Sequence, residues 1–252
     1  MAVNAAALAG PEYVVDPLKQ KKTNRVARGA ATNDLVFSAH VDTNDAVFPD
    51  VLRLYVPEGS RVADVTFGRG VFWKRISSDA YDLHATDIKT GVDCRALPYA
   101  DASFDAVVFD PPYMHTPGGT AHNGHQNYEH YYANNRLEPS DKKYHEAVLD
   151  LYFTAATEAR RVLRPEGVYI VKCADEVCAN QQRLTHVEII NQLTTVENFI
   201  VEDIFVVVRR NKPGVSRVLR QVHARKNHSY FLVFRKPKLS VRRPRRKTRQ
   251  TA

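Results

Sequence analysis

The amino-acid sequence predicts an α/β fold built on an open, mostly parallel sheet with helices on both faces. Three observations lead to this class. Short apolar runs with the character of buried strands alternate with segments of helical periodicity. Several of these runs end in an aspartate, and the first leads into a glycine-containing turn. The last two runs have no clear helix between them, which indicates a C-terminal hairpin.

The first expected element is a helix over residues 44–56. Pro49 is expected in its first turn, where a missing backbone N–H costs little. The apolar residues that recur at helical spacing are Val47, Val51, Leu54 and Tyr55.

Three short apolar runs in the first half have the form of buried strands. Each carries an aspartate at or next to its carboxyl end. Prolines and glycines bound the first run and separate it from its neighbours. The three predicted strands are 61–65, 83–87 and 106–110.

The second half continues the alternation. Residues 145–163 have strong helical periodicity, and this helix is expected to stop at the Arg-Pro-Glu-Gly turn of residues 164–167. A strand over 168–172 and a helix near 181–194 come next. The two strands of the expected hairpin are 203–208 and 229–234.

One main domain is expected, because 252 residues can bury one sizeable core. We place this domain at residues 34–236. Residues 1–33 show no sustained periodicity and are expected to form a flexible N-terminal arm. Residues 114–146 form a long polar insert, which we expect to bind substrate because loops of this length inside a domain are usually functional. Residues 237–252 are expected to be a basic disordered tail.

Charge is distributed unevenly along the chain, which carries 36 Lys and Arg, 28 Asp and Glu, and a net charge of +8. No acidic residue follows Asp203, whereas residues 205–252 hold 16 of the 36 basic residues. The first 204 residues therefore carry 36 − 16 = 20 basic and 28 acidic groups, a balance of −8. This polarity suggests a polyanionic partner that approaches the C-terminal part. A tail that only keeps the protein soluble is the alternative.

Neither a membrane span nor a disulfide framework is expected. No apolar run approaches the ~20 residues that a membrane-spanning helix needs, and the N-terminus lacks the basic start of a signal peptide. The three cysteines, Cys94, Cys173 and Cys178, are an odd number, which fits a reducing compartment. We therefore expect a cytoplasmic protein.

Ligands of open α/β sheets bind at the carboxyl ends of the strands. Residues 64–70 read Asp-Val-Thr-Phe-Gly-Arg-Gly, and the two glycines permit a tight turn that a ligand can approach closely. Asp87 closes the next strand, where an acidic side chain commonly accepts both hydroxyls of a ribose. Asp93 follows in a loop placed to meet an adenine edge. An ordinary turn at 64–70 and a helix cap at Asp87 are the structural alternatives.

The most specific signal is Asp110-Pro111-Pro112-Tyr113, directly after a predicted strand. Two prolines fix the backbone and remove two donors, so carbonyl oxygens remain as acceptors. An oxygen of Asp110 and the carbonyl of Pro111 can then accept the two protons of an aromatic amine in hydrogen bonds, which aims the nitrogen lone pair at an electrophilic methyl group. Tyr113 offers a flat face on which an extruded base can stack.

These segments together resemble the DNA amino-methyltransferases, which make N6-methyladenine or N4-methylcytosine. The resemblance rests on residues 64–70, Asp87, Asp93, residues 110–113 and the late strand within 226–236, and it covers roughly residues 36–236. It implies that the main domain is a Rossmann-like class I methyltransferase domain with a mostly parallel seven-stranded sheet. It also implies S-adenosyl-L-methionine as the cofactor and DNA as the partner.

The resemblance also implies roles for individual residues. The turn at 64–70 would hold the methionine part of the cofactor, completed by residues 40–54, while Asp87 would hold the ribose and Asp93 the adenine. The cofactor-binding set is Asp64, Thr66, Phe67, Gly68, Gly70, Asp87 and Asp93. The catalytic set is Asp110, Pro111, Pro112 and Tyr113.

The sequence departs from the family pattern in two respects. The family turn usually reads D-P-F-x-G-x-G, and here Val65 and Thr66 replace the Pro and the Phe. This change concerns the contacts to the methionine part rather than the backbone turn. No block is large enough to form a separate target-recognition domain, so recognition of the nucleic-acid sequence would fall to residues 114–146, residues 209–228 and the tail.

Adenine in DNA is the leading substrate, because the resemblance associates Asp rather than Ser at position 110 with adenine. N4 of cytosine in DNA and a base amine in RNA are alternatives, since the same four residues serve any exocyclic amine. A catalytically silent nucleic-acid-binding protein is an alternative from another class, against which the intact motif argues.

No metal is expected in this chain. The insert histidines have irregular spacing and no paired cysteines nearby, so they match no familiar zinc pattern. They are His115, His122, His125 and His130.

Overall fold

The computed structural model describes residues 35–112, 145–178, 181–210 and 220–238. All the elements below belong to one compact unit that begins at Val36. The predicted N-terminal arm at 1–33, nearly all of the insert at 114–146 and most of the tail at 237–252 lie outside the described residues, so these domain boundaries stay predictions. His145 and Glu146, which were assigned to the insert, are the first two residues of a helix.

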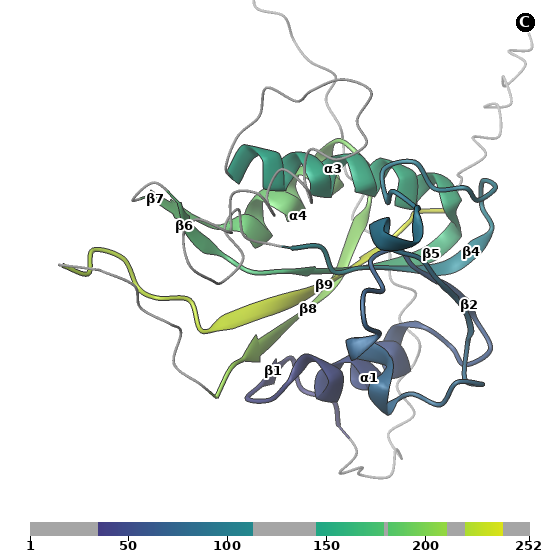
Figure 1. Cartoon of the computed structure of the whole chain (residues 1–252), viewed down its shortest axis with the longest axis horizontal. Coiled ribbons are helices and arrows are strands. Elements are labelled where there is room, and N and C mark those ends of the chain that lie inside the picture. The colour runs from purple at the N-terminus through teal and green to yellow at the C-terminus, as the bar shows by residue number, and fades with distance from the viewer. Residues whose placement is uncertain (1–34, 113–144, 179–180, 211–219, 239–252) are drawn as a thin grey trace, which may run out of the picture. The chain divides into compact units, whose positions relative to one another are not determined.

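A seven-stranded sheet forms the centre of the unit (Figure 1). All neighbouring strands are parallel except β9, which runs antiparallel to both β5 and β8. The predicted α/β class, the mostly parallel seven-stranded sheet and the C-terminal hairpin are therefore confirmed. From one edge to the other the strands are β1 (Ala39–His40), β8 (Ile200–Val208), β9 (His228–Arg235), β5 (Leu163–Cys173), β4 (Phe104–Phe109), β2 (Arg61–Asp64) and β3 (Asp82–Ala85).

Helices cover both faces of this sheet (Figure 1). α1 (Asn44–Tyr55) and the short 3-10 helix η1 (Val71–Arg75) pack together over one face, and α3 (His145–Val162) and α4 (Thr185–Thr195) cover the other. A second 3-10 helix, η2 (Ile88–Thr90), follows β3. No helix among the described residues combines the length and the apolar character that a membrane span requires.

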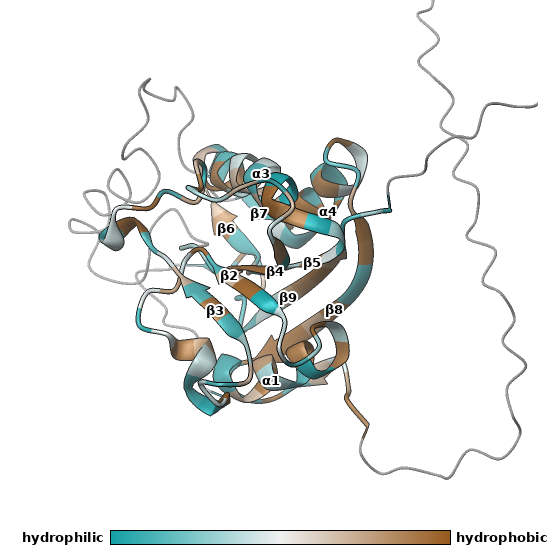
Figure 2. Cartoon of the chain, turned by 90° about the vertical axis from the view of Figure 1, so that its right-hand side faces the viewer, coloured by the Kyte–Doolittle hydropathy of each residue, from teal (hydrophilic) through white to brown (hydrophobic). Residues whose placement is uncertain are grey.

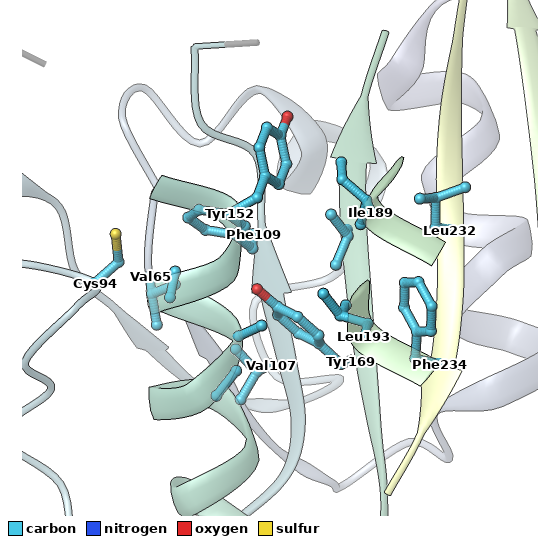
Figure 3. Close-up of a cluster of buried hydrophobic side chains, with 14 of the residues drawn as sticks. Val65, Cys94, Val107, Phe109, Tyr152, Tyr169, Ile189, Leu193, Leu232 and Phe234 are labelled. Carbon is cyan, nitrogen blue, oxygen red and sulfur yellow. The ribbon is translucent and has the colours of Figure 1, made fainter. Parts of the chain in front are cut away.

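The alternation of side chains along β4 explains why the core has two layers. Val107 and Phe109 belong to the cluster beneath α3 and α4, whereas Ala106 and Val108 belong to the cluster beneath α1. Tyr169 lies within the first cluster, between β4 and β9 (Figure 3). Its ring stacks on those of Phe109 and Phe199. Figure 2 shows the same arrangement as hydrophobic central strands between the two helical layers.

The first helix differs from its prediction in two details. Pro49 is the sixth residue of α1, in its second turn rather than its first, and the helix continues through it. The buried stripe consists of Val47, Phe48, Val51 and Leu52. Leu54 was expected in the stripe but points to solvent with 50% of its surface exposed, because the burying face is set one position earlier by Phe48 and Leu52.

The second half also shows differences at element boundaries. β5 begins at Leu163, directly after α3, instead of at residue 168, because residues 163–167 pair with β4 and with the chain after β9. A register shift lies between Phe104 and Ala106, opposite this irregular stretch. Residues 181–183 form β7, which pairs with β6 (Glu176–Cys178), so α4 starts four residues later than expected. The two-residue strand β1 was not predicted at all.

Candidate active site

The carboxyl ends of β2, β3 and β4 surround a cavity of about 390 Å³. It lies where the sequence predicted a ligand, and it brings together segments that are far apart along the chain. Predicted residues that line it are Asp64, Thr66, Phe67, Gly68, Asp87, Asp93, Asp110, Pro111 and Pro112. Tyr113, the remaining member of the predicted catalytic set, lies outside the described residues.

Asp64 fixes the start of the glycine turn. Its side chain is buried, with one oxygen accepting the N–H of Thr66 at 3.1 Å and the other accepting the indole N–H of Trp73 at 2.8 Å. Burial raises the pKa of Asp64 to about 7, against the lowering effect of these two hydrogen bonds. The aspartate thus anchors the turn to η1 while it lines the cavity.

The two glycines of the turn have different roles, although both have positive φ. Gly68 lines the cavity, and a Cβ built there would meet only the Thr66 carbonyl oxygen, at 3.8 Å. Gly70 was predicted to bind the cofactor but does not line the cavity. A Cβ at Gly70 would lie 2.6 Å from the Phe67 ring, so this glycine is needed for the turn itself.

Asp87 forms the helix cap that the sequence offered as the structural alternative, and it also lines the cavity. One oxygen accepts the N–H of Lys89, and together with Thr90 it forms a capping box on η2. The other oxygen accepts the N–H of Gly68 at 3.1 Å, which ties β3 to the glycine turn. Asp87 is therefore a helix cap that also lines the cavity.

Asp93 is held by a neighbouring arginine that the sequence analysis did not single out. The guanidinium of Arg95 contacts both carboxylate oxygens of Asp93, with the shortest N···O distance at 2.6 Å. Both side chains are largely buried, and the backbone N–H of Arg95 also donates to Asp93. This bidentate pair fixes the carboxylate at the cavity wall.

Asp110 is the most unusual carboxylate of the site. Its backbone N–H donates to the hydroxyl of Thr66 at 2.6 Å, so one of the two substituted turn residues directly joins the glycine turn to the Asp-Pro-Pro segment. Its Oδ1 is buried and has no hydrogen-bond partner among the described residues. Burial raises the pKa of Asp110, and the charge of Lys172 opposes that rise.

Lys172 was missed by sequence reasoning. It lies in β5 next to the end of β4, it is buried, and its Nζ donates to the hydroxyl of Ser229 in β9. Burial lowers the pKa of Lys172, and Asp110 is the first group that raises it. The available signal was a single lysine inside the apolar run that forms β5.

A second polar network follows the same edge of the sheet. Asp175 accepts hydrogen bonds from the His186 ring at 2.6 Å and from the Tyr230 hydroxyl at 3.2 Å. The ring of His228 contacts the same hydroxyl at 2.8 Å. These residues, like Lys172, come from segments far apart in sequence.

The described residues contain no group of three or more His, Cys, Asp or Glu side chains that could hold a metal ion. The four insert histidines lie outside this part of the chain, so the expectation of no metal stays a prediction for them.

Residues 104–251 match the DNA methylase family. This match spans more than half of the chain, starting at the strand that leads into Asp110 and including residues 110–113. The chain belongs to the DNA methylase family. The resemblance inferred from its motifs is thus confirmed. A search of curated proteins finds no match.

Solved structures with a similar arrangement share little sequence with this chain. TTHA0409 of Thermus thermophilus, a candidate DNA modification methylase in complex with S-adenosyl-L-methionine, is 18% identical with a TM-score of 0.38. That alignment covers 75% of this chain but only 59% of TTHA0409.

A second similar structure is the Burkholderia thailandensis 1,6-didemethyltoxoflavin-N1-methyltransferase with S-adenosylhomocysteine. It is 15% identical with a TM-score of 0.49, and the alignment covers 77% of this chain and 79% of the other. TrmN from Thermus thermophilus is 15% identical with a TM-score of 0.43, over 76% of this chain and 48% of TrmN.

Proposed function

We propose that this DNA methylase transfers a methyl group from S-adenosylmethionine to the exocyclic N6 amine of adenine in DNA. The observation that carries the proposal is the Asp110 carboxylate, which presents a buried oxygen with no partner among the described residues beside the ligand-sized cavity. Buried acceptors are normally paired, so an unpaired one at a cavity favours a ligand that brings a donor. An exocyclic amine is such a donor.

The cavity suits S-adenosylmethionine in size and in lining. Its volume of about 390 Å³ falls within the ~300–1,000 Å³ that small-molecule sites commonly have. Each oxygen of Asp87 accepts one backbone N–H, and a carboxylate has about four acceptor sites, which leaves capacity for ribose hydroxyls. Gly68 leaves its backbone open to a close approach. When bound, the cofactor supplies an electrophilic methyl group.

The Asp-Pro-Pro segment supplies the groups that would orient the target amine. A carboxylate oxygen of Asp110 and the carbonyl of Pro111 would accept its two hydrogens, which exposes the nitrogen lone pair on the opposite side. Positive charge that develops on the nitrogen during transfer is stabilised by the negative Asp110 carboxylate in this buried setting. Tyr113 is proposed as the stacking surface for the base.

A nucleic-acid substrate is supported by the basic connection between β8 and β9. This connection lies at the carboxyl end of β5, because Cys173 pairs with Tyr230 near the start of β9. The cavity lies at the carboxyl ends of the neighbouring strands. The basic residues and the proposed catalytic residues are therefore at the same end of the parallel strands. The described basic residues of the connection are Arg209, Arg210, Arg220, Arg225 and Lys226.

Phosphate contacts from such residues carry affinity without base specificity. Adenine is preferred over cytosine on the resemblance of Asp110 alone, and N4 of cytosine or a base amine in RNA remain the alternatives that the test distinguishes.

The test is to incubate the protein with isotopically labelled S-adenosylmethionine and separate pools of DNA and RNA, and to identify the modified nucleoside by mass spectrometry. Labelled N6-methyladenine from DNA is expected. Asp110→Ala serves as the negative variant. Asp101→Ala, a change at an exposed aspartate in the turn before β4, serves as its matched control. Label in N4-methylcytosine or only in RNA would select an alternative, and no label at all would support a silent binding protein.

A further inference from the structure

Lys172 is buried at a position where a lysine is costly. Its side chain is 1% exposed within a strand that is otherwise apolar over residues 168–173. Taking an ammonium group out of water requires compensating partners. Among the described residues, Nζ contacts the hydroxyl of Ser229 and the face of the Phe231 ring, whose centroid lies 4.7 Å from Nζ. Neither partner carries a negative charge.

The group of opposite charge that acts most strongly on Lys172 is the Asp110 carboxylate. β4 and β5 are parallel with Phe109 opposite Val171, so Asp110, the residue after β4, follows that pair on one side and Lys172 follows it on the other. Val108 and Ile170 both belong to the cluster beneath α1, and the alternation therefore places Asp110 and Lys172 toward that same face. Each of the two ionisable groups counters the effect of burial on its neighbour.

We propose that the ammonium group of Lys172 is the buried counter-ion that keeps the Asp110 carboxylate ionised, and that Lys172 is thereby a positioning residue of the methyl-transfer site. The statement about catalysis rests on the proposed function, whereas the charge pairing rests on the strand register, the burial of Lys172 and the opposite charges of the two groups. An ionised Asp110 accepts hydrogen bonds with both oxygens, while a protonated Asp110 would present a donor to the target amine. Lys172 thus selects the form of Asp110 that can bind an amine.

Other ionisable groups surround this pair. Asp64 at the end of β2 and Cys173 in β5 interact with Asp110, and Arg209 at the end of β8 acts on Lys172. Negative charge on Asp64 disfavours a charged Asp110, and the buried Cys173 thiol stays neutral because burial raises its pKa. Lys172 is the cation that lowers the pKa of Asp110, so its removal leaves burial unopposed.

The direct test is a titration of the Asp110 carboxyl carbon by NMR in protein labelled at aspartate, with the Asp110 signal identified from Asp110→Asn. In Lys172→Met the midpoint should rise by about 1 to 3 pH units, the usual effect of losing an adjacent opposite charge. Lys236→Met is the matched control. This half-buried lysine donates to the carbonyls of Arg160 and Leu163 near the end of α3, at the opposite end of β5 from Lys172. Its loss should leave the Asp110 midpoint in place. An unmoved midpoint in Lys172→Met would overturn the proposal.

Activity provides the second readout. The acidic limb of the pH profile of kcat should move to higher pH in Lys172→Met, with cofactor affinity preserved, whereas a merely structural lysine would lower activity at all pH values alike. If wild-type protein transfers no methyl group but Lys172→Met raises the Asp110 midpoint, the proposed function is refuted and the charge pair is supported. If wild-type protein is active but the Asp110 midpoint does not move in Lys172→Met, the charge pair is refuted and the proposed function stands.

A stability cycle covers the case in which Lys172→Met fails to fold. Removing one member of a buried charge pair leaves the other uncompensated, while removing both does not. The double variant Asp110→Asn with Lys172→Met should therefore be more stable than Lys172→Met alone in urea unfolding. A double variant that is no more stable than Lys172→Met would show that the lysine serves packing instead and would overturn the proposal.

Discussion

The carboxylates on the two sides of the cavity differ in their hydrogen bonding to the protein. On the glycine-turn side, formed by residues 64–70 with Asp87 and Asp93, every carboxylate oxygen already accepts a hydrogen bond from the protein. On the other side, the buried Oδ1 of Asp110 has no partner among the described residues. The carboxylates of the first side are thus held in place by protein hydrogen bonds, whereas Asp110 on the second side has an oxygen available to a ligand. Variants on the first side should therefore affect cofactor binding, and variants on the second side should affect methyl transfer.

The largest effect is expected from Asp110→Ala. Methyl transfer should fall by at least about 100- to 1,000-fold, the usual loss when one group that stabilises transition-state charge is removed. The affinity for S-adenosylmethionine should stay within a few-fold, because Asp110 accepts no hydrogen bond that shapes the turn. Single-turnover kinetics and calorimetry check the two halves of this prediction. Turnover at the wild-type rate would contradict the proposed role.

Asp87→Ala should give the reverse pattern. The loss of a carboxylate that accepts from Gly68 and could accept from the ribose should weaken cofactor binding by roughly ten- to a hundredfold, about 1.5–3 kcal/mol. Turnover at saturating cofactor should change much less. Calorimetry on folded variant protein measures the affinity, and unchanged binding would remove Asp87 from the cofactor site.

Gly70→Ala tests the packing within the turn, and Gly68→Ala tests the approach of the cofactor to the turn. Both positions have positive φ, which costs about 1–2 kcal/mol for a residue with a Cβ. At Gly70 the added Cβ also meets the Phe67 ring, so this variant should lose more stability than Gly68→Ala in urea unfolding. Gly68→Ala, with open space at its Cβ, should instead affect cofactor affinity. Equal losses of stability would show that the Phe67 contact is unimportant.

Asp64→Asn should change the pH dependence of stability, and its effect at any one step of pH is small. Because the pKa of Asp64 is raised to about 7 in the folded protein, the carboxyl stabilises the fold at low pH, and this contribution is lost as pH rises towards 7. Relative to Asp64→Asn, wild-type protein should lose up to about 1 kcal/mol per pH unit between about pH 4 and pH 7, with no further loss above. Urea unfolding of both proteins at several pH values measures the difference, and parallel profiles would contradict it.

The parts of the fold that the sequence revealed are those encoded locally. Apolar runs followed by aspartates located β2, β3 and β4, and all the residues predicted around one cofactor except Gly70 line one cavity. Roles that depend on contacts between distant segments were not visible. The pairing of Lys172 with Ser229 depends on strand register, and so does the hydrogen bond that joins Thr66 to Asp110.

Other differences have the same origin. The two-residue strand β1 exists only because β8 offers a parallel edge, and Leu54 was misplaced because the direction of burial of α1 is set by the sheet below it. The roles of the site residues stay predictions, as does the cytoplasmic location. The variants above test the roles of the site residues.

The position of β9 has a consequence for how the chain acquires its structure. β9, the last strand of the described residues, lies between β5 and β8, which both precede it in the sequence, and pairs with each along most of its length. Until residues 228–235 have been synthesised, both of those strands present unpaired backbone edges with apolar side chains. Cooperative folding must therefore wait for a late, long-range insertion, a topology associated with slow folding and transient exposure to aggregation.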